Sequence, residues 1–206
     1  PEPPAWVDLL LAEPPRAGIV PGAVPVVGFP EISMWGMNPW GGYGATPLPE
    51  RHERLWREAA PLCEGGFPYS EGRFEDINKV LYGGFYWEPA RPAADILAEY
   101  VGYEFSPAVV AEVCGAVRIL ERNHRQPDPD LAQEADALLG RAEARLSDAA
   151  RSSWRWRILR IRARIDRIGR TAQDPALAEA LQELVGLYYA QNALEGVVKP
   201  PVPVRR

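Results

Sequence analysis

Two glutamates each follow a predicted strand and stand among aromatic residues. Glu31 comes after the apolar run AVPVVGFP, and Glu71 comes after GGFPYS. Most glycoside hydrolases use a pair of carboxyl groups. One protonates the leaving oxygen, and the other acts as a base or nucleophile on the opposite side of the sugar ring. The pattern nominates Glu71 as the leading catalytic carboxylate and Glu31 as its partner or as a ligand to sugar hydroxyls.

The residues around these acids suit a sugar. Aromatic rings can lie against the apolar C–H face of a pyranose, an asparagine amide both donates and accepts hydrogen bonds, and a guanidinium can bind a carboxylate. The candidate substrate-binding residues are Trp35, Asn38, Trp40, Tyr43, Tyr69 and Arg73. The alternative is that the glutamates form caps or ion pairs, that the aromatic residues belong to the core, and that Arg73 neutralises neighbouring acids.

Other catalytic chemistry has no clear pattern in the chain. The only histidines are His52 and His124, and the only cysteines are Cys63 and Cys114. Their spacing fits neither a zinc site, nor a disulfide framework, nor a Ser-His-Asp triad with visible partners. The string GGYGA lacks the Lys-Ser/Thr that completes a phosphate-binding loop. We therefore expect no metal and no cofactor.

Composition and spacing predict the elements that position the acids. Most of the 22 prolines and 18 glycines precede residue 92. This part alternates a predicted strand at 23–29, a helix at 50–60, a second strand at the start of 65–72 and a helix at 74–85. The last two units of a (β/α)₈ barrel would have this order, and the chemistry of such barrels gathers at the carboxyl ends of the strands.

From residue 93 onward the apolar residues recur at helical spacing. Ser106 and either Asp128 or Asp130 are predicted N-caps, and an isoleucine seam at 154–168 requires an antiparallel partner. The predicted fold class is α+β tending to mainly α. Residues 1–90 are the C-terminal segment of a TIM-type barrel, 91–198 an antiparallel helical bundle, and 199–206 an extended tail.

Residues 151–170 hold eight arginines, which raises an RNA-binding alternative. Because the isoleucines form one stripe, the arginines can instead pair with acids on neighbouring helices. The expected acids are Glu134, Asp136, Glu143, Glu179 and Glu183. A net charge of -5 also disfavours a nucleic-acid partner. No apolar run approaches the roughly 20 residues of a membrane-spanning helix, so no membrane partner is expected.

Three segments together resemble a known class of enzyme. They are PEISMWGMNPWGGYGATPLP, YSEGRFEDINKVLYGGFYW and SWRWRILRIRARID. They are similar to the C-terminal third of large bacterial (β/α)₈ glycoside hydrolases related in style to α-glucuronidases. The resemblance implies that the first half supplies the last barrel strands with their active-site loops, and that the helical half packs behind them.

A complete barrel takes about 250 residues, so the resemblance implies that most strands come from a longer precursor or another chain. The absence of an initiator methionine points the same way. Alone, the chain is expected to expose apolar strand edges and to be inactive. The expected partners are a carbohydrate substrate, the remaining barrel strands and a second copy bound through the helical part. A non-catalytic carbohydrate-binding or scaffold module is the alternative, and the compartment stays open.

Overall fold

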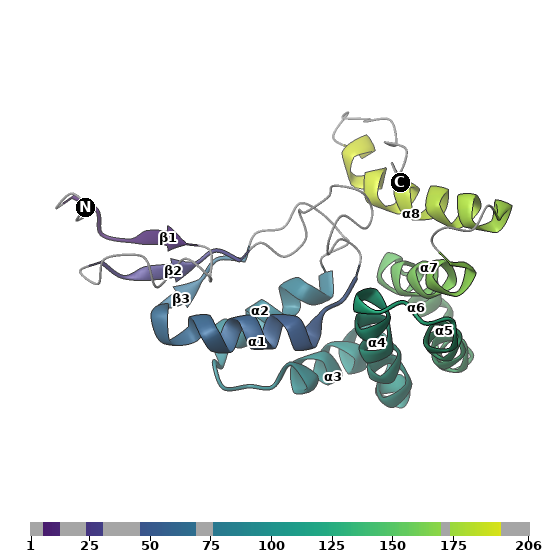
Figure 1. Cartoon of the computed structure of the whole chain (residues 1–206), viewed down its shortest axis with the longest axis horizontal. Helices are drawn as coiled ribbons and strands as arrows, with labels where there is room; N and C mark the ends of the chain where they lie inside the picture. The colour runs from purple at the N-terminus through teal and green to yellow at the C-terminus, as the bar shows by residue number, and fades with distance from the viewer. Residues whose placement is uncertain (1–5, 13–23, 31–45, 69–75, 170–173, 195–206) are drawn as a thin grey trace.

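The computed structural model describes residues 6–12, 24–30, 46–68, 76–169 and 174–194. They form a small sheet beside a larger set of helices (Figure 1). The strands are β1 (Leu10–Ala12), β2 (Val26–Gly28) and β3 (Gly65–Gly66). The helices are α1 (Pro49–Ala59), α2 (Asp76–Trp87), α3 (Ala93–Glu104), α4 (Val110–Arg125), α5 (Pro129–Glu143), α6 (Asp148–Ser152), α7 (Trp154–Ile168) and α8 (Pro175–Leu194). Short 3₁₀ turns, η2 (Ala60–Leu62) and η4 (Pro107–Val109), follow α1 and precede α4.

The sheet is parallel, in the order β1-β2-β3. One of its faces packs on Tyr86 of α2, whose hydroxyl donates to the carbonyl oxygen of Gly28 at 3.3 Å. The Tyr86 ring lies so close to Gly66 that a Cβ there would be 1.6 Å from it, so only glycine fits. Leu9, just before β1, and Leu11, within it, are 52% and 60% exposed.

The predicted TIM-type barrel is wrong for the described part of the chain. The order strand, helix, strand, helix is found in β2, α1, β3 and α2, and the strands are parallel as expected. However, the strands are only two or three residues long and form an open sheet. Most apolar residues between 49 and 168 are buried among helices instead, which makes the described protein mainly α with a small sheet.

The region after residue 93 is helical, as the periodicity predicts. Ser106 accepts a hydrogen bond from the amide of Ala108 at 3.1 Å, and Asp128 accepts one from Asp130 at 2.9 Å. Both predicted N-caps are thereby confirmed, with Asp128 the cap of α5. No helix in the described segments is long and apolar enough to cross a membrane.

Helix α7 is buried on two sides, which explains its composition. Trp156, Leu159 and Ala163 join the main core, which extends from α1 to α7. Ile158, Ile161 and Ile165 pack with apolar residues of α8 in a second cluster. The remaining positions are largely arginines, and they must be matched by acids on the helices alongside.

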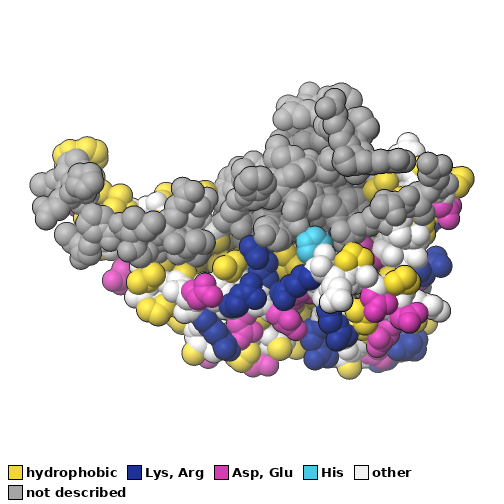
Figure 2. Space-filling view, viewed as in Figure 1, with side chains coloured by type: hydrophobic (Ala, Val, Ile, Leu, Met, Phe, Trp, Pro, Cys, Tyr) yellow, Lys and Arg dark blue, Asp and Glu magenta, His cyan; other side chains and the backbone are white. Residues whose placement is uncertain are grey.

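The arginines of α7 pair within the molecule. Arg157 binds Glu183 at 2.8 Å, Arg160 binds Asp136 at 2.8 Å and Glu143 at 3.3 Å, Arg164 binds Glu179 at 3.3 Å, and Arg167 binds Asp136 at 3.0 Å. Four of the five expected acids are confirmed as partners. Figure 2 shows basic and acidic side chains interspersed over the described helices on the face in view.

Candidate functional site

All eight residues nominated from the sequence lie outside the described residues. Glu31, Trp35, Asn38, Trp40 and Tyr43 belong to residues 31–45, and Tyr69, Glu71 and Arg73 belong to residues 69–75. The described residues nevertheless fix the positions from which these two segments start and at which they end.

The two segments start next to each other at one edge of the sheet. Strands β2 and β3 run parallel with Gly28 opposite Gly66. The amide of Phe67 donates to the carbonyl oxygen of Gly28 at 2.7 Å, and the rings of Phe29 and Phe67 stack with centroids 6.3 Å apart. Glu31 follows Phe29 by two residues and Glu71 follows Phe67 by four. Both acids therefore come shortly after neighbouring strand ends.

The same two segments also end next to each other. Thr46 follows the first segment and Asp76 follows the second. The side-chain amide of Asn78 joins them: it accepts a hydrogen bond from the amide of Leu48 at 3.0 Å and donates one to the carbonyl oxygen of Thr46 at 3.2 Å. Asn78 and Thr46 are both buried. The asparagine of the EDINK string thus connects the beginnings of α1 and α2.

The side chain of Asp76 binds residues of two other helices. Its carboxylate accepts hydrogen bonds from the Tyr100 hydroxyl and from Arg155 Nε, the latter at 3.0 Å. Burial, together with the charge of Asp76 and this hydrogen bond, raises the pKa of Tyr100. Asp76 therefore anchors the start of α2 on α3 and α7.

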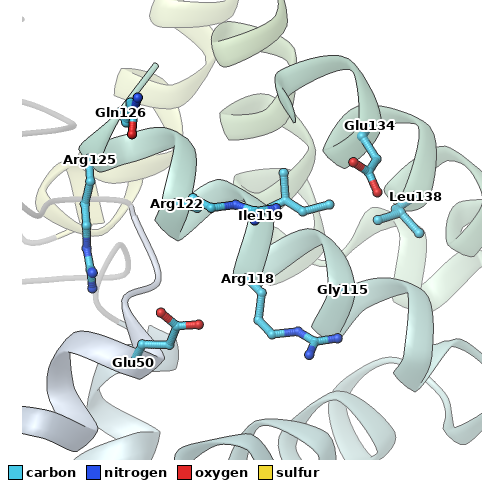
Figure 3. A pocket seen from close by; sticks show the side chains of 9 residues that line it. All are labelled: Glu50, Gly115, Arg118, Ile119, Arg122, Arg125, Gln126, Glu134 and Leu138. Atoms are coloured by element: carbon cyan, nitrogen blue, oxygen red, sulfur yellow. The ribbon is translucent and has the colours of Figure 1, made fainter. Parts of the chain in front are cut away.

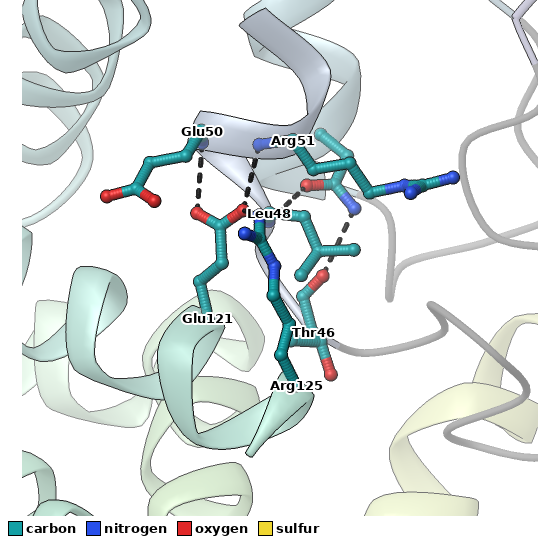
Figure 4. A network of polar contacts seen from close by, with 7 residues as sticks. Thr46, Leu48, Glu50, Arg51, Glu121 and Arg125 are labelled. Atoms are coloured by element: carbon teal, nitrogen blue, oxygen red, sulfur yellow. Dashed lines mark hydrogen bonds and ion pairs between the residues drawn. The ribbon is translucent and has the colours of Figure 1, made fainter. Parts of the chain in front are cut away.

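A buried carboxylate from α4 caps helix α1 (Figure 4). Pro49 begins the helix, and the side chain of Leu48 can provide no cap. Glu121 Oε2 and Oε1 instead accept hydrogen bonds from the amides of Glu50 and Arg51, each at 2.9 Å. Arg125 adds an ion pair to Glu121 at 2.9 Å. A helix N-terminus leaves free N–H groups and a partial positive charge, so a carboxylate is well suited to it.

Two opposing influences act on Glu121. Burial raises the pKa of its carboxyl group, while the two backbone amides and Arg125 act in the opposite direction, and burial dominates. The sequence offered no local signal for this contact, because Glu121 lies seventy or more positions from the amides that it binds.

His52 lies in the interior beside this junction. It is 1% exposed, and its ring meets the edge of the Tyr82 ring with centroids 5.2 Å apart. Within the described part of the chain, neither ring nitrogen has a hydrogen-bond partner, and the buried hydroxyl of Thr46 also lacks one. Burial, reinforced by the charge of Arg51, lowers the pKa of His52 to about 3. The imidazole is therefore neutral at pH 7 and cannot act there as a cationic group.

A second polar cluster fixes α4 to α7. Asn123 Nδ2 donates to Asp166 Oδ2 at 2.9 Å, and Asn123 Oδ1 accepts from the amide of Asp128 at 2.7 Å. Arg162 Nε lies 3.3 Å from Asp166 Oδ1, and both side chains are fully buried. Through Asn123 and Asp166, this buried cluster connects α4 with α7.

The described residues hold no group of three His, Cys, Asp or Glu side chains arranged for a metal ion. Cys63 and Cys114 are free and half-buried, and burial raises the pKa of both thiols.

The described frame can therefore do one thing plainly: it holds residues 31–45 and 69–75 at shared starting and ending points. A scan of family models, a search of curated proteins and a search of solved structures each returned no match to this chain.

Proposed function

We propose that this protein acts on carbohydrate, with Glu71 and Glu31 as the paired carboxyl groups that cleave a glycosidic bond. The observation that carries the proposal is the parallel register of β2 and β3, which starts both acid-bearing segments from one sheet edge. The beginnings of α1 and α2, tied together by Asn78, support it from the other side.

The distances at the sheet edge suit such a pair. Neighbouring strands lie about 4.8 Å apart, and the carboxyl groups of glycosidases lie about 5–5.5 Å apart in retaining enzymes or about 6.5–9.5 Å in inverting ones. Glu31 is two residues beyond Phe29, which allows a distance of up to about 7 Å along an extended chain. Glu71 is four residues beyond Phe67, which allows up to about 14 Å. Two carboxyl groups starting from adjacent strands need no long excursion to meet across a sugar ring.

The aromatic residues at the same edge suit the substrate class. Phe67 is 61% exposed and stacks on Phe29, which places flat apolar rings beside the strand ends. Trp35, Trp40, Tyr43 and Tyr69 would extend this surface for a pyranose ring. Asn38 would bind sugar hydroxyls, and Arg73 would bind a carboxylated sugar.

Hydrolysis of aryl glycosides with neutral and uronic sugars, measured on the full-length enzyme that contains this chain, tests the proposal. We expect Glu71→Gln and Glu31→Gln each to reduce kcat strongly. Loss of the general acid should also remove one limb of the bell-shaped pH profile. The matched control is Glu64→Gln, because Glu64 is an exposed glutamate just before β3. If turnover is unchanged in Glu71→Gln, the catalytic assignment is wrong.

Binding measured separately distinguishes the non-catalytic alternative. Oligosaccharide titrations followed by tryptophan fluorescence would detect a sugar site whether or not the bond is cleaved. Binding that survives in both glutamine variants, without turnover in any form of the protein, would favour a carbohydrate-binding module. The Phe29–Phe67 stack, in which Phe67 is exposed, is the feature that such a module would use.

A further inference from the structure

A cavity of about 590 Å³ lies between α4 and α5 and reaches the start of α1 (Figure 3). Arg118, Arg122 and Arg125 project from one helix, α4, and Glu50 and Glu134 come from α1 and α5. Apolar side chains, including Ile119 and Leu138, complete the lining. Pockets for small molecules commonly have about this size, with a few convergent polar groups.

The three arginines share a face because they are spaced four and three residues apart. Like charges at this spacing on a helix repel each other. The charge of Arg125 is offset by its ion pair with Glu121. Arg118 and Arg122 form no ion pair with any residue that the structure describes, although both line the cavity.

The arginines of α7 provide an internal comparison. Each of them, from Arg155 to Arg167, has a carboxylate partner within 3.5 Å. The chain therefore matches arginine with acid where the role is packing. On α4, Arg118 and Arg122 are exposed side chains that line the cavity and have no carboxylate partner among the described residues. Guanidinium groups without a carboxylate partner are suited to bind an anion.

We propose that this cavity binds a small hydroxylated oxyanion, of the class of sugar acids and sugar phosphates. Guanidinium groups bind carboxylate and phosphate through paired hydrogen bonds. The carboxylates of Glu50 and Glu134 can accept hydrogen bonds from hydroxyl groups, and Ile119 and Leu138 offer an apolar surface to a carbon skeleton. Because Glu121 already pairs with Arg125, Arg118 and Arg122 are the two guanidinium groups that would bind the acidic group of the ligand.

The proposed anion binding uses other residues than the proposed catalysis. The described lining of the cavity comes from α1, α4, α5 and Gln126, and the binding test involves neither Glu31 nor Glu71. Binding here does not depend on hydrolysis, so each proposal can fail without the other.

The test is a calorimetric and NMR titration of the full chain with glucuronate, glucose 6-phosphate, inorganic phosphate and glucose. We expect the two sugar anions to bind more tightly than about 1 mM and neutral glucose not to bind. A preference for one anion identifies the natural acidic group. Arg118→Gln and Arg122→Gln should each weaken binding about tenfold or more, since a charged hydrogen bond contributes about 1.5–3 kcal/mol.

Two further variants keep the result clear. Arg54→Gln removes an exposed arginine of α1 that does not line the cavity, and it should leave binding unchanged. Arg122→Lys keeps the charge but loses the paired geometry, so it should fall between wild type and Arg122→Gln. Circular dichroism checks that each variant is folded. The proposal is overturned if neither sugar anion binds, if inorganic phosphate alone binds, or if Arg54→Gln weakens binding as much as Arg122→Gln.

Discussion

Acid should destabilise this protein through His52, and the size of the effect follows from its burial. The folded-state pKa of His52 is lowered from 6.5 to about 3. Below pH 6.5 the unfolded chain takes up a proton on this ring that the folded chain cannot take up until about pH 3. The unfolded state therefore binds more protons in this window, and the free energy of unfolding falls as the pH falls.

The loss can be calculated at an accessible pH. Each pH unit within the window changes the free energy of unfolding by about 1.36 kcal/mol. From 6.5 down to pH 5 the change is 1.5 units, which corresponds to about 2 kcal/mol. That is a large part of the total stability of about 5–15 kcal/mol of an ordinary domain. His52→Phe keeps an aromatic ring against Tyr82 and removes the titrating group, so it should remove this contribution.

The assay is urea unfolding of wild type and His52→Phe at pH 8, 7, 6 and 5, followed by tryptophan fluorescence. Groups elsewhere in the chain titrate in both proteins, so the difference between their pH dependences isolates His52. The two proteins should change in parallel between pH 8 and 7 and diverge by about 2 kcal/mol at pH 5. Parallel curves down to pH 5 would show that His52 is protonated normally in the folded protein, and the reasoning from burial would be refuted.

Three substitutions test other contacts by the same unfolding measurement. Glu121→Ala should cost about 2–3 kcal/mol, because it uncaps α1 and leaves Arg125 without its carboxylate; a loss below about 0.5 kcal/mol would contradict this role. Gly66→Ala should cost about 1–3 kcal/mol because the new Cβ collides with the Tyr86 ring. Gly65→Ala should be nearly neutral, because nothing lies within 4 Å of a Cβ at that position. Equal effects of the two substitutions would contradict the packing argument. Asn78→Ala should cost about 2–3 kcal/mol, since it leaves a buried amide and a buried carbonyl unpaired, and a neutral result would mean that water replaces the amide.

The sequence correctly predicted those helices, strands and caps that depend on residues close together in the chain. The β-branched run at 23–29 contains β2, helical spacing marks the helices after residue 93, and Ser106 and Asp128 cap as expected. The pairing of the α7 arginines also followed from spacing, because an isoleucine stripe leaves arginine on the flanks. β1 was not predicted, since three residues between proline-rich stretches give too short a pattern.

The arrangement of the sheet and the frame of the site depend on distant contacts. Whether parallel strands close into a barrel is decided by pairings between remote segments, which no local period encodes. Glu121 and Asn78 look like ordinary polar helix residues until α1 is placed beside them. His52 carries no sequence mark of burial. The spacing of Arg118, Arg122 and Arg125, by contrast, was readable from the sequence, and helical periodicity alone would have placed them on one face.

The cap that α4 provides to α1 has a consequence for how the protein is made. Glu121 is synthesised seventy residues after Arg51, whose amide it binds. At about 5–20 residues per second, the ribosome needs roughly 4 to 14 s to add that length. During this interval water takes the place of Glu121 at the amides of Glu50 and Arg51, and the surface that α4 later covers is open to chaperones and proteases. A translational pause between residues 59 and 121 should therefore lower the yield of intact protein.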